Sequence, residues 1–183
     1  MKKIALITLL SACIATPALA DNTGKFYVAG DLGSATYSNI GGWPNPGVVR
    51  IAGGFHFSPQ VAAEIGYSKF GDSTLTGPGG SGTLSASSFQ VAAIGTLPLS
   101  PQFDLLGKIG IANNSYNVTG NIFGLGFFSG SSSQSDLLVG LGAQFHVNSQ
   151  VTLRAQYDSY GKFENVSSPM KASSFSVGIA YNF

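Results

Sequence analysis

The chain has 183 residues, a formal net charge of +1 and 9% charged residues, whereas an average soluble domain has about 25%. This even charge balance, without a cluster of lysine and arginine, excludes a nucleic-acid-binding surface, and we expect no nucleic acid partner. Beyond the N-terminus, no apolar run reaches the roughly 18 residues that a membrane-spanning helix needs.

The first twenty residues have the layout of a secretory signal peptide. Two lysines precede an apolar stretch that closes with the sequence TPALA, a small-residue cleavage site. We expect cleavage after Ala20, so that residues 1–20 are a signal peptide and residues 21–183 form a single domain. The alternative is a lipoprotein signal, in which Cys13 is lipidated and becomes the first residue. Cleavage after Ala20 would leave a chain without cysteine, and so without a disulfide or a thiol nucleophile.

Three similar short sequences punctuate the rest of the chain: SPQ at 58–60, SPQ at 100–102 and NSQ at 148–150. Each stands between two segments in which apolar and polar residues alternate. Serine, proline and asparagine in so short a gap are typical of a tight turn, and a tight turn between strands makes an antiparallel hairpin.

Alternation of apolar and polar residues predicts eight strands of about 10 residues, the length that a tilted strand needs to cross a bilayer. These strands are 25–37, 48–58, 61–70, 88–99, 103–112, 136–147, 151–160 and 174–183. Longer segments rich in glycine and serine alternate with the short turns, and we expect flexible loops there. The predicted loops are 38–47, 71–87, 113–135 and 161–173.

The two faces of the predicted strands differ in composition. One face is bulky and apolar, and the other holds glycine, alanine, serine and a few charges. Eight strands enclose an interior only just wide enough for side chains, so the small and polar residues fit inside and the bulky residues fit outside, against lipid. A soluble barrel of the opposite orientation would need many lysines and glutamates on its exterior, and the sequence does not supply them.

We therefore predict an all-β fold: an eight-stranded antiparallel up-and-down transmembrane β-barrel with a polar interior and a lipid-facing apolar exterior. A closed barrel pairs every backbone group, which strands in hydrocarbon require. The short turns and both termini are expected on the periplasmic side, and the long loops are expected outside the cell.

Several segments resemble the OmpA-like eight-stranded barrels of Gram-negative outer membranes. They are KFYVAGDLGSATYS, VAAEIGYSKFG, FDLLGKIGIAN, GLGAQFHVNSQVTLRAQYDSY and the terminal VGIAYNF. The resemblance implies an outer-membrane location and a role for the aromatic last strand as the signal that the barrel-insertion machinery recognises. That signal would be Phe175, Val177, Ile179, Tyr181 and Phe183. Since the chain ends there, we expect no appended peptidoglycan-binding domain.

Six polar residues are predicted to meet inside the barrel: Asp31, Arg50, Glu64, Lys108, Gln144 and Arg154. Buried charges have to be paired, because an isolated one costs several kcal/mol. The cluster is either a hydrogen-bonded plug or a gate, since the resembling family has an interior charge cluster to which gating is attributed. Asp31 stands where that family usually has lysine and Gln144 where it usually has glutamate, which weakens the case for a gate.

We predict no catalytic residue, no metal site and no cofactor. His56 and His146 both lie two residues before a short turn, and we expect them to be paired inside the barrel. Two histidines with one nearby carboxylate make a poor metal site. Some eight-stranded barrels modify lipid A, but lipid A lies in the leaflet opposite to these histidines.

The predicted role is structural or surface-interactive, such as envelope integrity, adhesion or contact with a host or cell-surface ligand at the loops. The alternatives are passage of small or hydrophobic solutes and, third, an enzyme acting on lipid A. The expected partners are outer-membrane lipid, lipopolysaccharide and the insertion machinery, and we expect a monomer or a weak oligomer. Lys69, above the apolar face, either reaches the headgroups or contacts a lipopolysaccharide phosphate.

Overall fold

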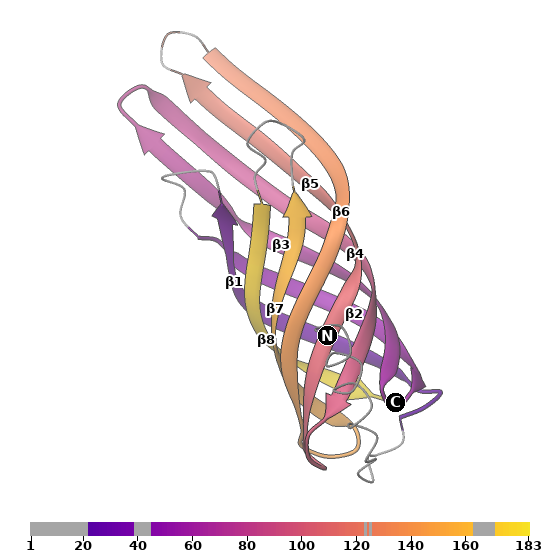
Figure 1. Ribbon diagram of the computed structural model, residues 1–183. Coiled ribbons are helices and arrows are strands. Elements are labelled where there is room, and N and C mark those ends of the chain that lie inside the picture. The colour runs from indigo at the N-terminus through magenta and orange to yellow at the C-terminus, as the bar shows by residue number, and fades with distance from the viewer. Residues whose placement is uncertain (1–21, 39–44, 123, 125, 163–170) are drawn as a thin grey trace, which may run out of the picture.

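The strands form one closed ring in chain order, and β1 pairs with β8 to close it (Figure 1). The computed structural model describes residues 22–38, 45–122, 124, 126–162 and 171–183. The strands are β1 (Phe26–Ser38), β2 (Gly47–Ser58), β3 (Val61–Gly77), β4 (Gly80–Pro98), β5 (Phe103–Ile122), β6 (Gly126–His146), β7 (Val151–Lys162) and β8 (Lys171–Asn182). Within these ranges, no helix has the length and apolar character to cross a membrane.

The predicted all-β, eight-stranded antiparallel barrel is confirmed. The bounds of β1, β2, β7 and β8 agree with the sequence prediction to within a few residues. The predicted signal peptide, 1–20, and most of the predicted loops 38–47 and 161–173 lie outside the described residues.

The three short turns share one hydrogen-bond pattern, which explains their similar sequences. In each, the side-chain oxygen of the first residue accepts the backbone N–H groups of the residues two and three positions later. These acceptors are Ser58, Ser100 and Asn148, with N···O distances of 2.8–3.4 Å. A side chain that bonds the turn's own backbone in this way fixes a tight reversal. We call the end of the barrel that carries these turns the short-turn end.

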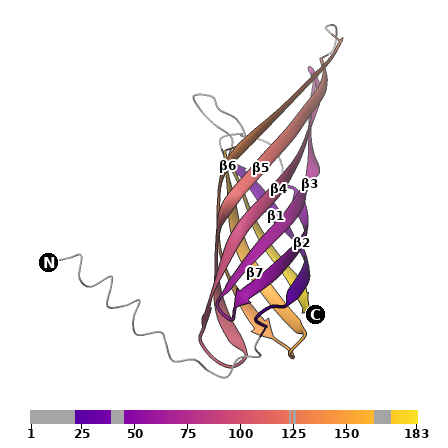
Figure 2. The same ribbon diagram turned by 90° about the vertical axis from the view of Figure 1, so that its right-hand side faces the viewer.

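The prediction of flexible loops at 71–87 and 113–135 is wrong. Strands β3 and β4 continue to a turn at residues 78–79, and β5 and β6 continue to Ile122 and Gly126. The four strands rise well above the ring as a sheet, as Figure 1 and Figure 2 show from two directions. We call this part, residues 71–87, 113–122 and 126–135, the ribbon, and this end of the barrel the ribbon end.

The ribbon escaped prediction because its sequence lacks the alternation that marks a strand with one apolar face. Its residues are mostly serine, threonine, asparagine and glycine on both faces, which is also the composition of a loop. What extends the strands is the neighbour: each one continues a ladder that is already formed in the barrel. Side-chain pairs reinforce it, such as Thr74 and Thr83, whose hydroxyl oxygens are 3.2 Å apart.

Alternate side chains point to opposite sides of the wall, as the strand period requires. The outward set is large and apolar and remains exposed, for example Leu141 at 71% and Ile51 at 63%. The inward set is buried and largely polar, small or charged. The structure thus puts the bulky apolar set outside and the charges inside, in the predicted orientation.

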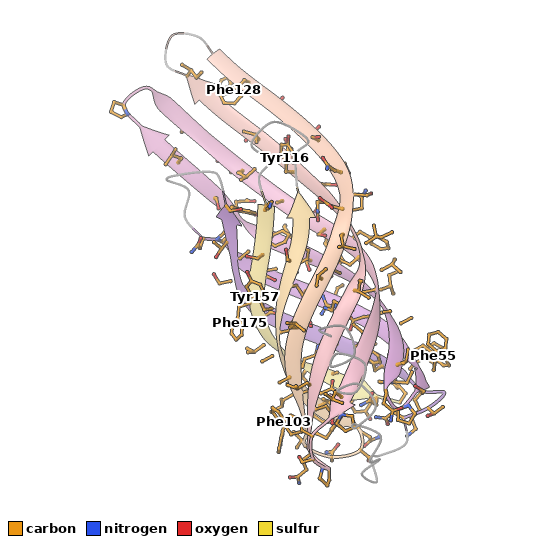
Figure 3. The ribbon with its side chains drawn as sticks, in the orientation of Figure 1. Phe55, Phe103, Tyr116, Phe128, Tyr157 and Phe175 are labelled. Atoms are coloured by element: carbon orange, nitrogen blue, oxygen red, sulfur yellow. The ribbon has the colours of Figure 1, made fainter. Side chains whose placement is uncertain are left out.

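Aromatic residues gather at two levels of the outer wall. Near the short-turn end, they include Phe26, Phe55 and Phe103, and the rings of Phe26 and Phe55 lie 4.8 Å apart. Near the ribbon end, Tyr157 is paired with Phe175 and projects with it from the wall (Figure 3). Aromatic belts at two levels are the pattern of a barrel that spans a bilayer between two polar interfaces.

Candidate functional site in the lumen and the ribbon

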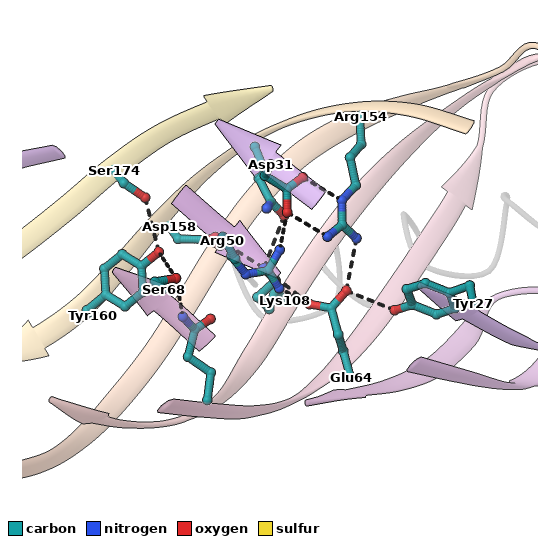
Figure 4. Close-up of polar contacts among 12 residues, drawn as sticks. Tyr27, Asp31, Arg50, Glu64, Ser68, Lys108, Arg154, Asp158, Tyr160 and Ser174 are labelled. Atoms are coloured by element: carbon teal, nitrogen blue, oxygen red, sulfur yellow. Dashed lines mark hydrogen bonds and ion pairs between the residues drawn. The ribbon is translucent and has the colours of Figure 1, made fainter. Parts of the chain in front are cut away.

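The centre of the lumen holds a network of buried ion pairs (Figure 4). Arg154 from β7 donates Nε and Nη2 to the two carboxylate oxygens of Asp31, each at 2.8 Å, and Nη1 to Glu64 Oε2 at 2.9 Å. Arg50 from β2 donates to Asp31 Oδ2 at 2.7 Å and also binds Glu64. These four side chains are at most 4% exposed, so the pairs are shielded from water.

Lys108 extends the network toward the ribbon end. Its Nζ lies 3.6 Å from Glu64 Oε1, 3.1 Å from Asp158 Oδ2 and 3.0 Å from Gln156 Oε1. With Asp158 included, three cations face three carboxylates. Such a balanced network tolerates burial because each charge has an opposite charge within reach.

Five of the six residues expected in the lumen cluster come into this network, and Gln144 does not. Gln144 instead donates Nε2 to Asp104 Oδ2 at 2.9 Å, nearer the short-turn end. Asp158 takes part although it is not among the six residues predicted for the cluster. Its inward position on β7, two strand periods from Arg154, was the signal that could have included it.

A tyrosine lies on either side of the network. The hydroxyl of Tyr27 donates to Glu64 Oε2 at 2.9 Å. Toward the ribbon end, the hydroxyl of Tyr160 lies 3.3 Å from Ser68 Oγ and 3.2 Å from Ser174 Oγ (Figure 4). These neutral partners occupy the space around the charges, so the charged layer is continuous with hydrogen-bonded layers above and below.

An apolar layer lies above the charges, at the ribbon end. Phe70 and Tyr160 are fully buried, with ring centroids 5.3 Å apart in an edge-to-face arrangement, and Tyr37 packs 6.2 Å from Phe70. Below the charges, the cavity bounded by Tyr27 and Ile94 has a volume of about 30 Å³, room for about one water molecule. The lumen is therefore filled with side chains on both sides of the ion pairs.

The histidines lie near the short-turn end, as expected, and His146 has hydrogen-bonding partners inside the barrel. His146 places Nε2 2.7 Å from Asp104 Oδ2 and Nδ1 3.0 Å from Thr152 Oγ1. His56 packs its ring 4.9 Å from that of Tyr27. A hydroxyl, an imidazole and a carboxylate in this order have the make-up of a nucleophile triad, but the Thr152 residue is only 4% exposed.

Glycine makes room for the central pair. Gly178 on β8 is the register partner of both Asp31 and Arg154, which therefore meet above it. A Cβ at Gly178 would run into the carbonyl oxygen of Gly30 and the backbone and carboxylate of Asp31. The absence of a side chain in β8 thus allows the arginine and the aspartate to touch.

We expect Gly178→Ala to lower the free energy of unfolding by about 1–3 kcal/mol, because the added methyl group must move backbone atoms of β1. Denaturant titration of the protein in lipid vesicles measures the change. Gly30→Ala is the matched control, since a Cβ at Gly30 enters open space. Equal unfolding free energies for the two variants would show that the close approach at Gly178 is unimportant.

The residues of the predicted insertion signal all project from the outer wall of the last strand. Phe175, Val177, Ile179, Tyr181 and Phe183 are 39–65% exposed. The rings of Tyr181 and Phe183 lie 5.3 Å apart. They form an apolar stripe along the strand that closes the ring.

The outer membrane protein beta-barrel domain family matches residues 5–183 of the chain. Outer membrane protein A of Shigella flexneri is 25% identical over 201 aligned positions, which cover all of this chain and 56% of that protein. The chain thus spans about half the length of this curated relative.

Solved structures share the fold at low sequence identity. Neisserial surface protein A is 20% identical with a TM-score of 0.65, covering 86% of this chain and 97% of that one. Ail of Yersinia pestis, in complex with the heparin analogue sucrose octasulfate, is 14% identical with a TM-score of 0.64, covering 88% and 99%. The outer membrane protease OmpT of Escherichia coli is 12% identical with a TM-score of 0.56, covering 92% and 99%.

The family match and the closed ring with an apolar outer wall lead to the same conclusion. They support a location in the outer membrane, with the apolar wall against lipid. The chain belongs to the outer membrane protein beta-barrel domain family.

Proposed function

We propose that the protein is a closed, non-enzymatic barrel that holds the ribbon outside the cell for contact with other molecules. The observation that carries this proposal is the filled lumen: buried ion pairs lie between an apolar layer and a cavity of about 30 Å³. A plug of this kind favours anchoring over transport. The ribbon, which is the extension of the four long strands β3 to β6, then supplies the surface for contact with other molecules.

In the proposed orientation, the short turns and the C-terminus face the periplasm and the ribbon faces outward. Short periplasmic turns and longer external segments are the usual arrangement of such barrels. The outward stripe of β8 would serve as the insertion signal, residues 1–20 as the signal peptide, and the barrel as a monomer in lipid and lipopolysaccharide. An epitope inserted at the turn of residues 78–79 tests the orientation, because an antibody should reach it on intact cells and should not reach an epitope inserted in a short turn.

The arrangement of Asp104, His146 and Thr152 does not support catalysis. The Thr152 residue is almost completely buried in the lumen, so a substrate has no room to approach its hydroxyl. Unchanged lipid A mass spectra after deletion and overexpression of the protein would agree with this reading. A lipid A product that appears only on overexpression would contradict it.

Passage of small solutes is the second candidate, since a cavity of about 230 Å³ opens beside Asp104 and His146 at the short-turn end. We expect purified protein in liposomes to give no conductance above that of empty liposomes, because the ion pairs and the apolar layer block the path. Conductance steps or solute uptake that require the protein would favour passage over the proposed role.

Removal of the ribbon should abolish surface binding and leave the barrel intact. Replacing residues 74–83 and 115–133 by Asn-Gly turns joins Ser73 to Leu84 and Asn114 to Gln134, which are register partners. We expect the variant to fold and to lose binding to target cells, measured with labelled bacteria. Each single replacement shows which hairpin matters, and full binding by the double variant would contradict a role for the ribbon.

A further inference from the structure

The outward face of the ribbon is a regular array of hydroxyl and amide side chains. Thr74, Thr83, Thr119 and Ser129 lie side by side on β3, β4, β5 and β6, separated by the strand spacing of about 4.8 Å. The oxygens of Thr74 and Thr83 are 3.2 Å apart. This row is therefore a line of hydroxyl groups across four strands.

The rows on either side have the same character. Ser85, Asn117 and Ser131 form the row nearer the barrel. On the far side, Asn121 lies next to Phe127, which is 89% exposed. Hydroxyl and amide groups both donate and accept hydrogen bonds, so the face can bond partners that present both kinds of group.

Two grooves shape this face. One, of about 400 Å³, is lined by Thr83, Thr119, Asn121 and the Phe127 ring. The other, of about 520 Å³, is closer to the barrel and includes Tyr67 and Lys69 among serine and asparagine side chains. Ring faces beside hydroxyl and amide groups suit saccharides, which have apolar C–H faces and hydroxyl edges.

Charge narrows the class of saccharide. Within the ribbon as defined, Asp72 is the one charged residue, and it accepts a hydrogen bond from Ser85 at 2.7 Å. A sulfated polyanion would meet a single cation on this face, Lys69 at the edge of the barrel, whereas it would need several charge-assisted contacts. The ribbon face therefore fits neutral sugar units.

The face continues the lipid-facing wall without interruption. On β4, Ser87 follows the outward Phe89, and on β5, Asn113 follows the outward Ile111, each at the next position on the same side. A lipid molecule that lies against this wall therefore has its polar end beside the hydroxyl and amide side chains of the ribbon. Lys69 stands at the boundary, where its ammonium group can meet a lipid phosphate.

We propose that the outward face of the ribbon binds the neutral saccharide units of lipopolysaccharide in its own leaflet. The proposal rests on the orientation given above, in which the ribbon lies outside the cell. The hydroxyl and amide rows bind the sugars, Phe127 and Tyr67 cover their apolar faces, and Lys69 faces the phosphate at the lipid end.

The test uses the full protein in phosphatidylcholine nanodiscs and three soluble probes. These are a core oligosaccharide released from lipopolysaccharide and freed of its phosphate groups and acidic sugars, N-acetyllactosamine as a neutral glycan of other cells, and a heparin oligosaccharide. We expect the core oligosaccharide to bind at least about tenfold more tightly than the other two, and to slow hydrogen exchange in β4 and β5 of the ribbon. Tighter binding of N-acetyllactosamine or heparin would overturn the choice of ligand.

The variant for this test is Thr83→Val with Thr119→Val, which removes two hydroxyl groups and keeps β-branched residues in the strands. We expect core oligosaccharide affinity to fall about tenfold, with an unchanged circular dichroism spectrum. Thr36→Val is the control, because Thr36 is exposed on β1, paired with β8 and away from the ribbon. Undiminished affinity in the double variant overturns the proposal, whereas an epitope at residues 78–79 that an antibody cannot reach on intact cells overturns the orientation instead.

Discussion

Glu64→Ala is expected to lower the free energy of unfolding by about 3–5 kcal/mol, the cost of breaking a buried ion pair by removing one partner. Glu64 contacts Arg50, Arg154 and Lys108, and it accepts the Tyr27 hydroxyl. Without it, three cations share two carboxylates in a site that excludes water. Denaturant unfolding in lipid vesicles, followed by far-ultraviolet circular dichroism, measures the loss of unfolding free energy.

Asp72→Ala is the matched control for this prediction. Asp72 is an exposed carboxylate of the ribbon, bonded to Ser85, and exposed interactions of this kind contribute little to stability. We expect no measurable change for Asp72→Ala. If Glu64→Ala also unfolds at the wild-type denaturant concentration, Glu64 does not stabilise the barrel through the network described here.

Phe70→Ala should also cost about 3–5 kcal/mol, the range for removing a large buried aromatic side chain. Phe70 is fully buried and packs against Tyr37 and Tyr160 in the apolar layer above the charges. Its loss leaves a void next to the ion pairs. We expect a lower free energy of unfolding together with a small conductance in liposomes, since water then reaches the charged layer from the ribbon end.

Phe89→Ala removes the same side chain from the lipid-facing wall. Phe89 is 47% exposed on the neighbouring strand β4, where acyl chains fill the space that the ring vacates. We expect a smaller loss of stability than for Phe70→Ala and no conductance. Equal effects of the two substitutions would mean that the inward layer is no better packed than the lipid-facing surface.

The fold could be predicted because a membrane barrel imposes period-two alternation on its strands. The bulky outward set and the small or charged inward set identified both the strands and their orientation. The three turn sequences were equally informative, since Ser58, Ser100 and Asn148 each bond the backbone that follows them. These are local signals, which a single sequence carries in full.

The ribbon could not be predicted from the same signals. Both of its faces are polar over most of their length, so alternation disappears above Phe89 and Ile111. Its strand structure depends on pairing with the adjacent strand, and such pairing is visible only once the barrel register is known. The two polar hairpins therefore had the composition of loops and the structure of strands.

The lumen site was partly predictable. The alternation of inward and outward positions along each strand shows that a charge lies inside, but it does not give the height of that charge along the barrel axis. Strand tilt and register set that height, so Gln144 lies near the short-turn end while Asp158 reaches Lys108. The contact of Arg154 with Asp31 across Gly178 depended on the seam between β1 and β8, which no local pattern shows.

That seam has a consequence for assembly order. Every other pairing joins strands that are consecutive in the chain, whereas β1 and β8 come from opposite ends. Closing short connections costs less chain entropy, so the hairpins should form before the ends meet. Arg154 can then pair with Asp31 only in the final step, and before that step the open sheet lacks this ion pair. The contact between Arg154 and Asp31 therefore stabilises the closed ring and not the open sheet.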